Sequence, residues 1–248
     1  MRGLVIYLVL ASSACAGTID DDISDARYRE YGETFAPYTA RIVGVQTDDS
    51  PAFATCTLVA PEWALTAAHV VEEMAHCCVV TGTAAHKIDR IFVHPEYVRI
   101  FADDIALVHV ETPFALKRYP PLTDGTEAVG SVCAAAGYGV TGKITVGFNT
   151  GDAEIRAGTM VLDYIEGTNY ICRIDRGRSP LPFAIAPGDS GGGLYAAASD
   201  GRTVLVGVNS FTSKRGKPPM RSAVGEESGH TRVAYFKAWI DGVVGCKE

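Results

Sequence analysis

The stretch IAPGDSGGGLY, residues 185–195, places one serine, Ser190, between Asp189 and three glycines. Glycine lets the chain turn sharply and lets other groups approach its backbone closely. Such a backbone suits a tight loop, and it also suits a hydroxyl presented at a reactive site. A nucleophilic serine would need a base to take its proton and an acid to orient that base.

Two other segments supply candidates for the base and the acid. His69 ends the run WALTAAH, where small alanines leave room for an imidazole to face a cleft. Asp104 stands at the head of the apolar run DIALVHVE, and a carboxylate buried there needs a donor such as an imidazole N–H. The order histidine, aspartate, serine is that of the chymotrypsin-type triad. Each residue alone also fits a structural role, a core histidine or a strand cap, but the three together predict nucleophilic catalysis.

Short β-type runs recur from Ile42 onward, separated by Gly, Pro, Asp and Asn. Examples are FATCTLVA (53–60), KIDRIFVH (87–94) and TVLVGVNSF (203–211). Many short strands at regular spacing predict an antiparallel sandwich or barrel. Residues 234–244 repeat apolar side chains every three or four positions, which predicts a C-terminal helix.

Four motifs in sequence order give the chain a close resemblance to the trypsin/chymotrypsin family of serine proteases, as a secreted bacterial member. They are RIVGV (41–45), LTAAHV (65–70), DDIALV (103–108) and GDSGG (188–192), and the ending TRVAYFKAWI (231–240) is also similar. The resemblance covers residues 42–241. It implies an all-β fold of two six-stranded antiparallel β-barrels, about 42–117 and 118–234, with the active-site cleft between them and the helix at 234–244.

The resemblance also implies a role for each matching residue. Ser190 would be the nucleophile, His69 the general base and then acid, and Asp104 the orienting acid. The backbone N–H groups of Gly188 and Ser190 would form the oxyanion hole. Ser210 matches a residue beneath the triad, and the backbone of 210–212, including Phe211, would pair with an extended substrate.

Specificity follows from the positions that match the main substrate pocket. Ala184 matches the floor of the pocket, and the absence of an acid there disfavours Lys and Arg substrates. Thr212 matches a wall position that is often glycine, so we expect a small or medium apolar side chain before the cleaved bond. His230 matches a position near the base of the pocket beside Ser228, and a charged imidazole would favour an acidic side chain instead. Both preferences stay open at this point.

The resemblance implies activation by cleavage after Arg41. Residues 17–41 are polar and acidic, and we expect them to form a pro-segment ahead of a peptidase domain at 42–248. Cleavage would free the α-amino group of Ile42, which would then reach Asp189 and order the backbone of 188–190.

The first 16 residues have the pattern of a signal peptide. Arg2 precedes an apolar run from Leu4 to Ala11, and ACA (14–16) fits the small-x-small cleavage signature. SSAC (12–15) alternatively resembles a bacterial lipobox, with Cys15 lipidated. The protein is therefore expected to be secreted, or lipid-anchored in the bacterial cell envelope and in contact with a membrane only in that case.

Six cysteines remain without Cys15, and an even number in an exported protein predicts disulfide bonds. The family's usual partner positions are Val70, Ala186 and Ala196 here, so the pairing departs from the family; Cys77 or Cys78 could reach Cys56. A zinc site near Cys77, Cys78 and His76 lacks the usual ligand spacing, and no metal or cofactor is expected.

The composition is that of a globular protein: 248 residues, 47% hydrophobic and 21% charged, with a net charge of -7. The acidic balance excludes a nucleic-acid partner on electrostatic grounds. The expected partners are protein or peptide substrates, an activating protease and protein inhibitors.

Two other functions compete with the peptidase. An α/β-hydrolase would also contain G-x-S-x-G, but it needs a helix directly after Ser190, and Gly191 to Gly193 are poor helix formers. It would also use an acid and a histidine later in the chain, such as Asp200 and His230. A catalytically silent, protease-like binding domain would usually lack a triad residue, and all three are present.

Overall fold

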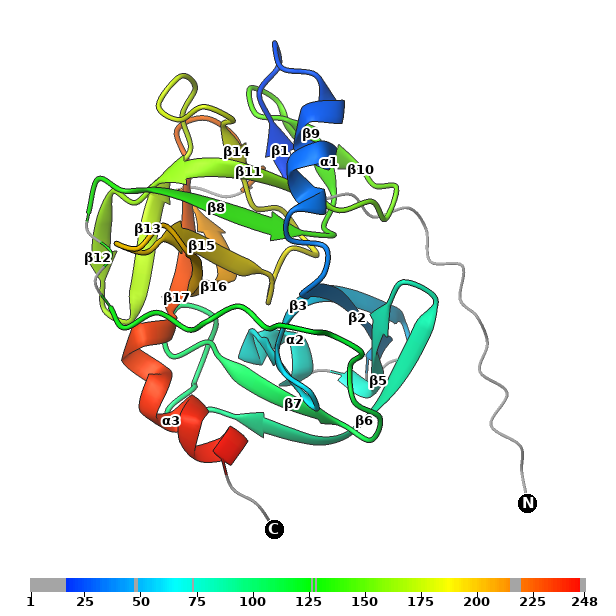
Figure 1. Cartoon of the computed structure of the whole chain (residues 1–248). Coiled ribbons are helices and arrows are strands. Elements are labelled where there is room, and N and C mark those ends of the chain that lie inside the picture. The colour runs from blue at the N-terminus through cyan, green and yellow to red at the C-terminus, as the bar shows by residue number, and fades with distance from the viewer. Residues whose placement is uncertain are drawn as a thin grey trace.

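The computed structural model describes residues 17–46, 49–72, 74–125, 127, 129–214 and 220–245. The predicted leader, with Cys15, and Cys246 lie outside the described residues. Two β-rich halves follow one another along the chain, and a helix ends it (Figure 1).

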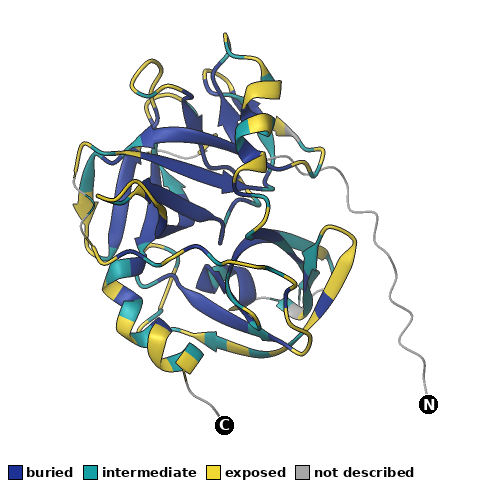
Figure 2. Cartoon of the chain, viewed as in Figure 1, coloured by how far each residue is buried: buried dark blue, intermediate teal, exposed yellow. Residues whose placement is uncertain are grey.

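The first half is a closed barrel of six strands in the order β2-β3-β4-β7-β6-β5. Fully buried aliphatic side chains such as Ile42, Leu58 and Leu107 fill it. Figure 2 shows dark blue, buried stretches on strands of both halves. A short helix, α2 (Ala68–Glu72), follows β4. The strands are β2 (Thr39–Gln46), β3 (Pro51–Ala60), β4 (Trp63–Thr66), β5 (Met74–Thr81), β6 (Ala84–Val93) and β7 (Ala106–Val110).

The second half is a sheet of seven strands in the order β11-β8-β15-β16-β17-β13-β12. The predicted all-β class is confirmed, although the second half is assigned as this sheet rather than as a second closed six-stranded barrel. The strands are β8 (Val132–Gly137), β11 (Arg156–Val161), β12 (Tyr164–Glu166), β13 (Asn169–Arg173), β15 (Gly193–Ala197), β16 (Thr203–Ser213) and β17 (Glu227–Arg232).

The predicted C-terminal helix is α3 (Val233–Gly245). It follows the second half, but its buried face, including Phe236 and Ile240, belongs to the core of the first barrel. The ring of Phe236 lies 4.7 Å from that of His94, which follows β6. The helix therefore ties the end of the chain back to the first half (Figure 1).

Residues 17–41, which the sequence predicts to be a pro-segment, pack within the fold. β1 (Thr18–Ile19) lies between β9 (Thr141–Lys143) and β14 (Phe183–Ala184) in a four-stranded sheet completed by β10 (Gly147–Thr150). Helix α1 (Asp25–Glu33) then packs on β11, above the first barrel in Figure 1.

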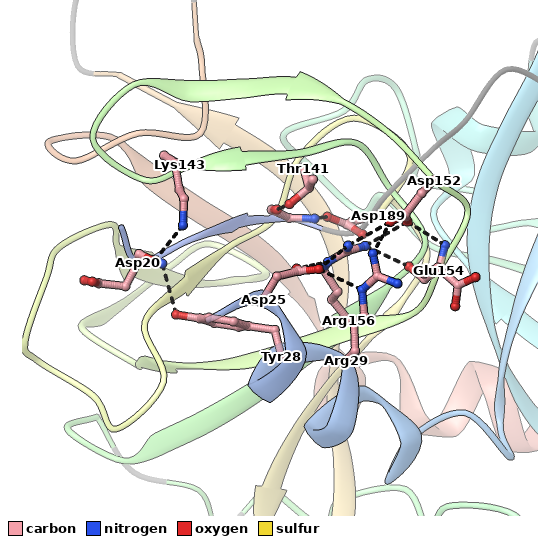
Figure 3. Close-up of polar contacts among 11 residues, drawn as sticks. Asp20, Asp25, Tyr28, Arg29, Thr141, Lys143, Asp152, Glu154, Arg156 and Asp189 are labelled. Carbon is pink, nitrogen blue, oxygen red and sulfur yellow. Dashed lines mark hydrogen bonds and ion pairs between the residues drawn. The ribbon is translucent and has the colours of Figure 1, made fainter. Parts of the chain in front are cut away.

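A buried arginine anchors α1. Arg156, on β11, is 1% exposed, and its guanidinium donates to Asp25 at the start of α1 and to Asp152 (Figure 3). Both of these bonds start from Nη2, at 2.8 and 3.0 Å. The guanidinium of Arg156 is the first cause of the lowered pKa of Asp25. The polar sequence of α1 is thus held by a tertiary ion-pair network rather than by a broad apolar face.

Replacing the buried guanidinium should loosen the N-terminal segment. We expect Arg156→Leu to reduce the free energy of unfolding by about 3 kcal/mol, the low end for a broken buried pair because Asp25 and Asp152 keep access to water. Because the pKa of Asp25 is lowered, its contribution is present above the unfolded pKa and is lost as the pH falls through the folded one. Urea unfolding at neutral and acidic pH measures both effects. Arg202→Leu, which removes an exposed pair with Asp200, is the matched control and should change stability by less than about 0.5 kcal/mol.

The expected disulfide between Cys56 and Cys77 or Cys78 is wrong for a geometric reason. Cys56 lies on β3 opposite Ala40, whereas Cys77 and Cys78 lie on β5, on the other side of β2. Two strand spacings are roughly 10 Å, beyond the roughly 7 Å limit between the Cα atoms of bridged cysteines. Within the described residues all five cysteines are free thiols: Cys56, Cys77, Cys78, Cys133 and Cys172.

The chain segment after Ser190 excludes the α/β-hydrolase alternative. β15 begins at Gly193, so a strand stands where that fold requires a helix.

Among the described residues, no helix is long and apolar enough to span a membrane.

Candidate active site

His69 and Asp104 are joined by two hydrogen bonds. Asp104 lies two residues before β7 and is fully buried, while His69 lies in the first turn of α2. The Oδ1 atom of Asp104 accepts the backbone N–H of His69 at 2.9 Å, and Oδ2 lies 2.7 Å from Nδ1 of the imidazole. Because a carboxylate only accepts, Nδ1 carries the hydrogen, and Nε2 of a neutral His69 is left as the proton acceptor.

Two residues of the second half also hydrogen-bond Asp104. Ser210, on β16, is hydrogen-bonded through Oγ to Oδ2 of Asp104 and lies 3.1 Å from the carbonyl oxygen of Ile100. Thr231, on β17, donates its hydroxyl to the backbone oxygen of Asp104 at 3.0 Å. The acid is therefore fixed between the two halves, as expected for Ser210, and Thr231 is a further contributor that no sequence motif indicated.

The loop that carries Ser190 is docked on the first barrel. The backbone N–H of Thr55, on β3, donates to Ser190 O at 3.0 Å, and the Thr55 hydroxyl donates to Gly188 O at 2.7 Å. A Cβ on Gly191 would lie 2.1 Å from Oγ1 of Thr66, only three positions before His69. These contacts bring the serine loop to the end of the barrel where the histidine begins α2.

Gly188 has a conformation and a neighbourhood that only glycine fits. Its φ is +94°, and a Cβ would lie 2.4 Å from the ring of Phe53 and 2.8 Å from Cα of Gly139. Within the described chain, no residue accepts a hydrogen bond from the N–H of Gly188 or of Ser190. Their role as an oxyanion hole stays a prediction, which these two unused N–H donors permit.

Asp189 is fully buried behind this loop and accepts three backbone hydrogen bonds of 2.8 Å. Gly139 donates to Oδ1, and Ala186 and Gly17 donate to Oδ2. Burial raises the pKa of Asp189 to about 7, while the three N–H donors and the field of Arg156 act in the opposite direction. The carboxylate thus links the N-terminal segment to the serine loop.

The structure does not bring Arg41 and Ile42 to Asp189, where the predicted activation cleavage would place the new amino group. Both residues lie inside β2, which is paired along its length with β3 and β5. Ile42 stands opposite Ala54 and Val79 and is fully buried in the first barrel. Freeing its amino group would remove the edge-to-edge pairing that closes the barrel.

The predicted pocket residues lie on three elements of the second half. Ala184, on β14, is buried with Ile144 and Ile174 and stands opposite Thr18 of β1. Phe211 and Thr212, on β16, stand opposite Gly229 and Ser228 of β17. A Cβ on Gly229 would lie 2.2 Å from the Phe211 ring, so this glycine makes room for the aromatic side chain.

His230 is fully buried and is oriented by Asn209. Nδ2 of Asn209 donates to the carbonyl oxygens of Ala136 and Asp189, so its Oδ1 faces Nδ1 of His230 at 2.9 Å. Nδ1 therefore carries the imidazole hydrogen. Burial lowers the pKa of His230 to about 3, so the ring is neutral over the physiological range. Asn209 was missed from the sequence because an amide beside Ser210 has no motif of its own.

Comparison with known proteins agrees with this arrangement. The family model described as Trypsin matches residues 30–240. The chain is 25% identical to Serine protease SSP1 of Scolopendra subspinipes, over 89% of this chain and 83% of that protein, and 28% identical to Proproteinase E of Bos taurus, over 85% and 92%. It also matches Ovochymase of Halocynthia roretzi at 22% identity, but spans only 13% of that protein's length. The solved structure of HL collagenase shares the fold, with a TM-score of 0.62 at 22% identity over 86% of this chain and 95% of that one.

Proposed function

The chain belongs to the trypsin family of serine proteases, and we propose from that premise that it is a serine endopeptidase acting through an acyl-enzyme intermediate. The observation that carries the proposal is the hydrogen-bonded series from Ser210 through Asp104 to His69, set against the loop of Ser190. The series leaves Nε2 of His69 as the base that a serine nucleophile requires.

The chemistry uses only groups of this chain and one water. Nε2 of His69 takes the proton of Ser190 as Oγ attacks the substrate carbonyl carbon, and the oxyanion accepts from the N–H groups of Gly188 and Ser190. The imidazolium then protonates the leaving amine, and the C–N bond breaks to give the acyl-enzyme. Water, deprotonated by His69, releases the acid and restores Ser190. Asp104 holds the imidazole and stays ionised throughout.

A serine-directed label tests the proposal against the silent binding domain. A fluorophosphonate should label the processed protein once, at Ser190, as located by peptide mass spectrometry. Prior treatment with the label should abolish peptidase activity. A folded, processed protein that is neither labelled nor active would support a binding role instead.

We further propose that the enzyme prefers a small or medium apolar residue before the cleaved bond. A neutral His230 gives no cation for an acidic side chain, and Ala184 supplies no acid for Lys or Arg. An acidic preference is the second candidate, because the buried Ser228 Oγ and His230 Nε2 have no hydrogen-bond partner among the described residues. Either atom could serve a polar substrate group if the ring became protonated on binding.

Cleavage of a peptide library distinguishes the two preferences. We expect apolar residues to be favoured over Glu and Asp by about tenfold or more at pH 8, and His230→Phe to keep the apolar preference. A profile dominated by Glu or Asp, and lost in His230→Phe, would establish the acidic alternative. A profile dominated by Lys or Arg would contradict both.

Export of the protein also remains a proposal. It is supported by the apolar run Leu4 to Ala11 and by the small-x-small pattern at 14–16. Fractionation of the producing cells would test it, since an exported enzyme should be found in the medium or the cell envelope.

A further inference from the structure

Asp189 is a buried carboxylate whose hydrogen-bond donors, among the described residues, are all uncharged. The three donors are backbone N–H groups of Gly17, Gly139 and Ala186. A buried carboxylate without a cation in contact is costly, and it is stabilised most directly by a positive charge at hydrogen-bond distance. Cleavage of one peptide bond can turn a backbone nitrogen into a charged ammonium group. Of the three donors, only Gly17 can be cleaved in this way without dividing the folded chain, because Gly139 and Ala186 lie in its interior.

The chain around Gly17 is held so that this nitrogen meets the carboxylate. Gly17 has a φ of +55°, and a Cβ would lie 2.1 Å from the ring of Phe183 and 2.7 Å from the oxygen of Ala184. Its carbonyl accepts the hydroxyl of Thr141 at 2.6 Å, and Thr18 is fully buried. The next residues form β1, paired on one side with β9 and on the other with β14.

An independent feature of the sequence marks the same bond. The small-x-small pattern Ala14-Cys15-Ala16 ends immediately before Gly17, where a leader peptidase would cut. Hydrolysis there adds water across the Ala16–Gly17 bond, giving a carboxylate on Ala16 and an amine on Gly17 that takes up a proton. Sequence pattern and tertiary contact therefore agree on one position.

We propose that removal of residues 1–16 is itself the activating cleavage, because it turns the Gly17 nitrogen at Asp189 into an ammonium group. The proposal rests on the proposed peptidase function. It assigns a processing site at the Ala16–Gly17 bond, and activation then needs no separate cleavage after Arg41. The ion pair holds Asp189, and with it the Gly188 and Ser190 amides on either side. Cleavage before Cys15, the lipoprotein alternative, would keep Gly17 in an amide and leave this pair unformed.

The pair also sets a pH dependence. Arg156 on β11, which pairs with Asp25 and Asp152, is the charged side chain that acts on Asp189 through its field. None of these is in contact with Asp189 in the way that Gly17 is. Pairing raises the α-amino pKa above its usual value of about 7.7–8.0. Its stabilisation is complete below that unfolded value and is lost as the pH rises through the raised one.

The proposal is tested with two full-length variants. Each carries an engineered protease site, and the two cleavage positions differ by one residue. In the first, Ser13→Ile, Ala14→Glu, Cys15→Gly and Ala16→Arg introduce an Ile-Glu-Gly-Arg site, so that factor Xa releases a chain beginning at Gly17. In the second, Ser12→Ile, Ser13→Glu, Ala14→Gly and Cys15→Arg shift the site, so that the chain begins at Ala16. Mass spectrometry verifies each N-terminus, and circular dichroism verifies folding before and after the cut.

The first variant should gain about 10²-fold or more in peptidase activity and fluorophosphonate labelling on cleavage, the value of one oxyanion-hole donor. The second variant should stay near its uncut level, and Arg41→Gln added to the first should activate normally. Equal activity in both cut forms, or full activity in an uncut form, would overturn the proposal while leaving the peptidase function intact. Failure of every folded form to react would instead count against the peptidase function.

Discussion

Ser190→Ala is expected to fold like the unchanged protein and to lose about 10⁶-fold in turnover, the scale seen when a serine nucleophile of this chemistry is removed. Among the described residues, the Ser190 side chain makes no hydrogen bond, and the loop is held through the backbone oxygen of Ser190 and the flanking glycines. Removing Oγ therefore removes the attacking atom without disturbing the fold.

The loss is measured as kcat on a peptide substrate with the chain cut before Gly17, alongside the unfolding temperature. Ser199→Ala, an exposed serine beyond β15, is the matched control and should keep full activity. Residual turnover within a hundredfold of the unchanged enzyme, in a pure and folded Ser190→Ala sample, would remove Ser190 from the role of nucleophile.

Asp104→Asn is expected to lower kcat by about 10⁴-fold, the size of the effect when the triad aspartate of a chymotrypsin-type protease is replaced by asparagine. The reason lies in the two hydrogen bonds that the carboxylate accepts from His69. Oδ1 accepts the backbone N–H of His69, and Oδ2 accepts the hydrogen on Nδ1. An asparagine has one acceptor oxygen, so its NH₂ group must face one of these donors. The relaxed arrangement keeps the backbone bond and makes Nδ1 the acceptor, which moves the ring hydrogen to Nε2 and removes the base.

The pH dependence separates this tautomer effect from a structural one. At high pH, where hydroxide replaces the missing base, the variant should recover part of its rate, while its unfolding temperature stays close to that of the parent. Asp103→Asn changes the neighbouring carboxylate, whose residue has a φ of +53° that asparagine tolerates, and should keep most of the activity. A loss of less than tenfold in Asp104→Asn would show that the orientation of His69 does not depend on Asp104.

The sequence by itself identified the residues whose chemistry is local. His69, Asp104 and Ser190 each stand in a short motif whose composition predicts both the element and the side chain it presents. The alternating and apolar runs predicted the strands, and the three-to-four spacing at 234–244 predicted α3, since these periodicities follow directly from backbone geometry. The two glycines at 188 and 191 were recognisable because a turn of that shape tolerates no side chain.

Only the tertiary structure showed which element the run RIVGV (41–45) forms. A β-branched run after an arginine reads equally well as a cleavage junction or as a strand, because both favour extended, apolar residues. In the closed first barrel this run is a strand, since Ile42 is paired on both sides and buried. The local sequence carries no information about which strands will lie beside it.

The same limit applies to the N-terminal segment and the cysteines. Asp25–Glu33 reads as a polar tail, because its helix depends on Arg156, which lies more than a hundred residues along the chain. Cys56 and Cys78 are near in sequence, but β2 separates their strands. The meeting of Gly17 with Asp189 spans 172 positions, and it exists only because β1 is inserted between β9 and β14. Contacts of this kind depend on which distant surfaces the folded core brings together, and a sequence pattern reports only its own neighbourhood.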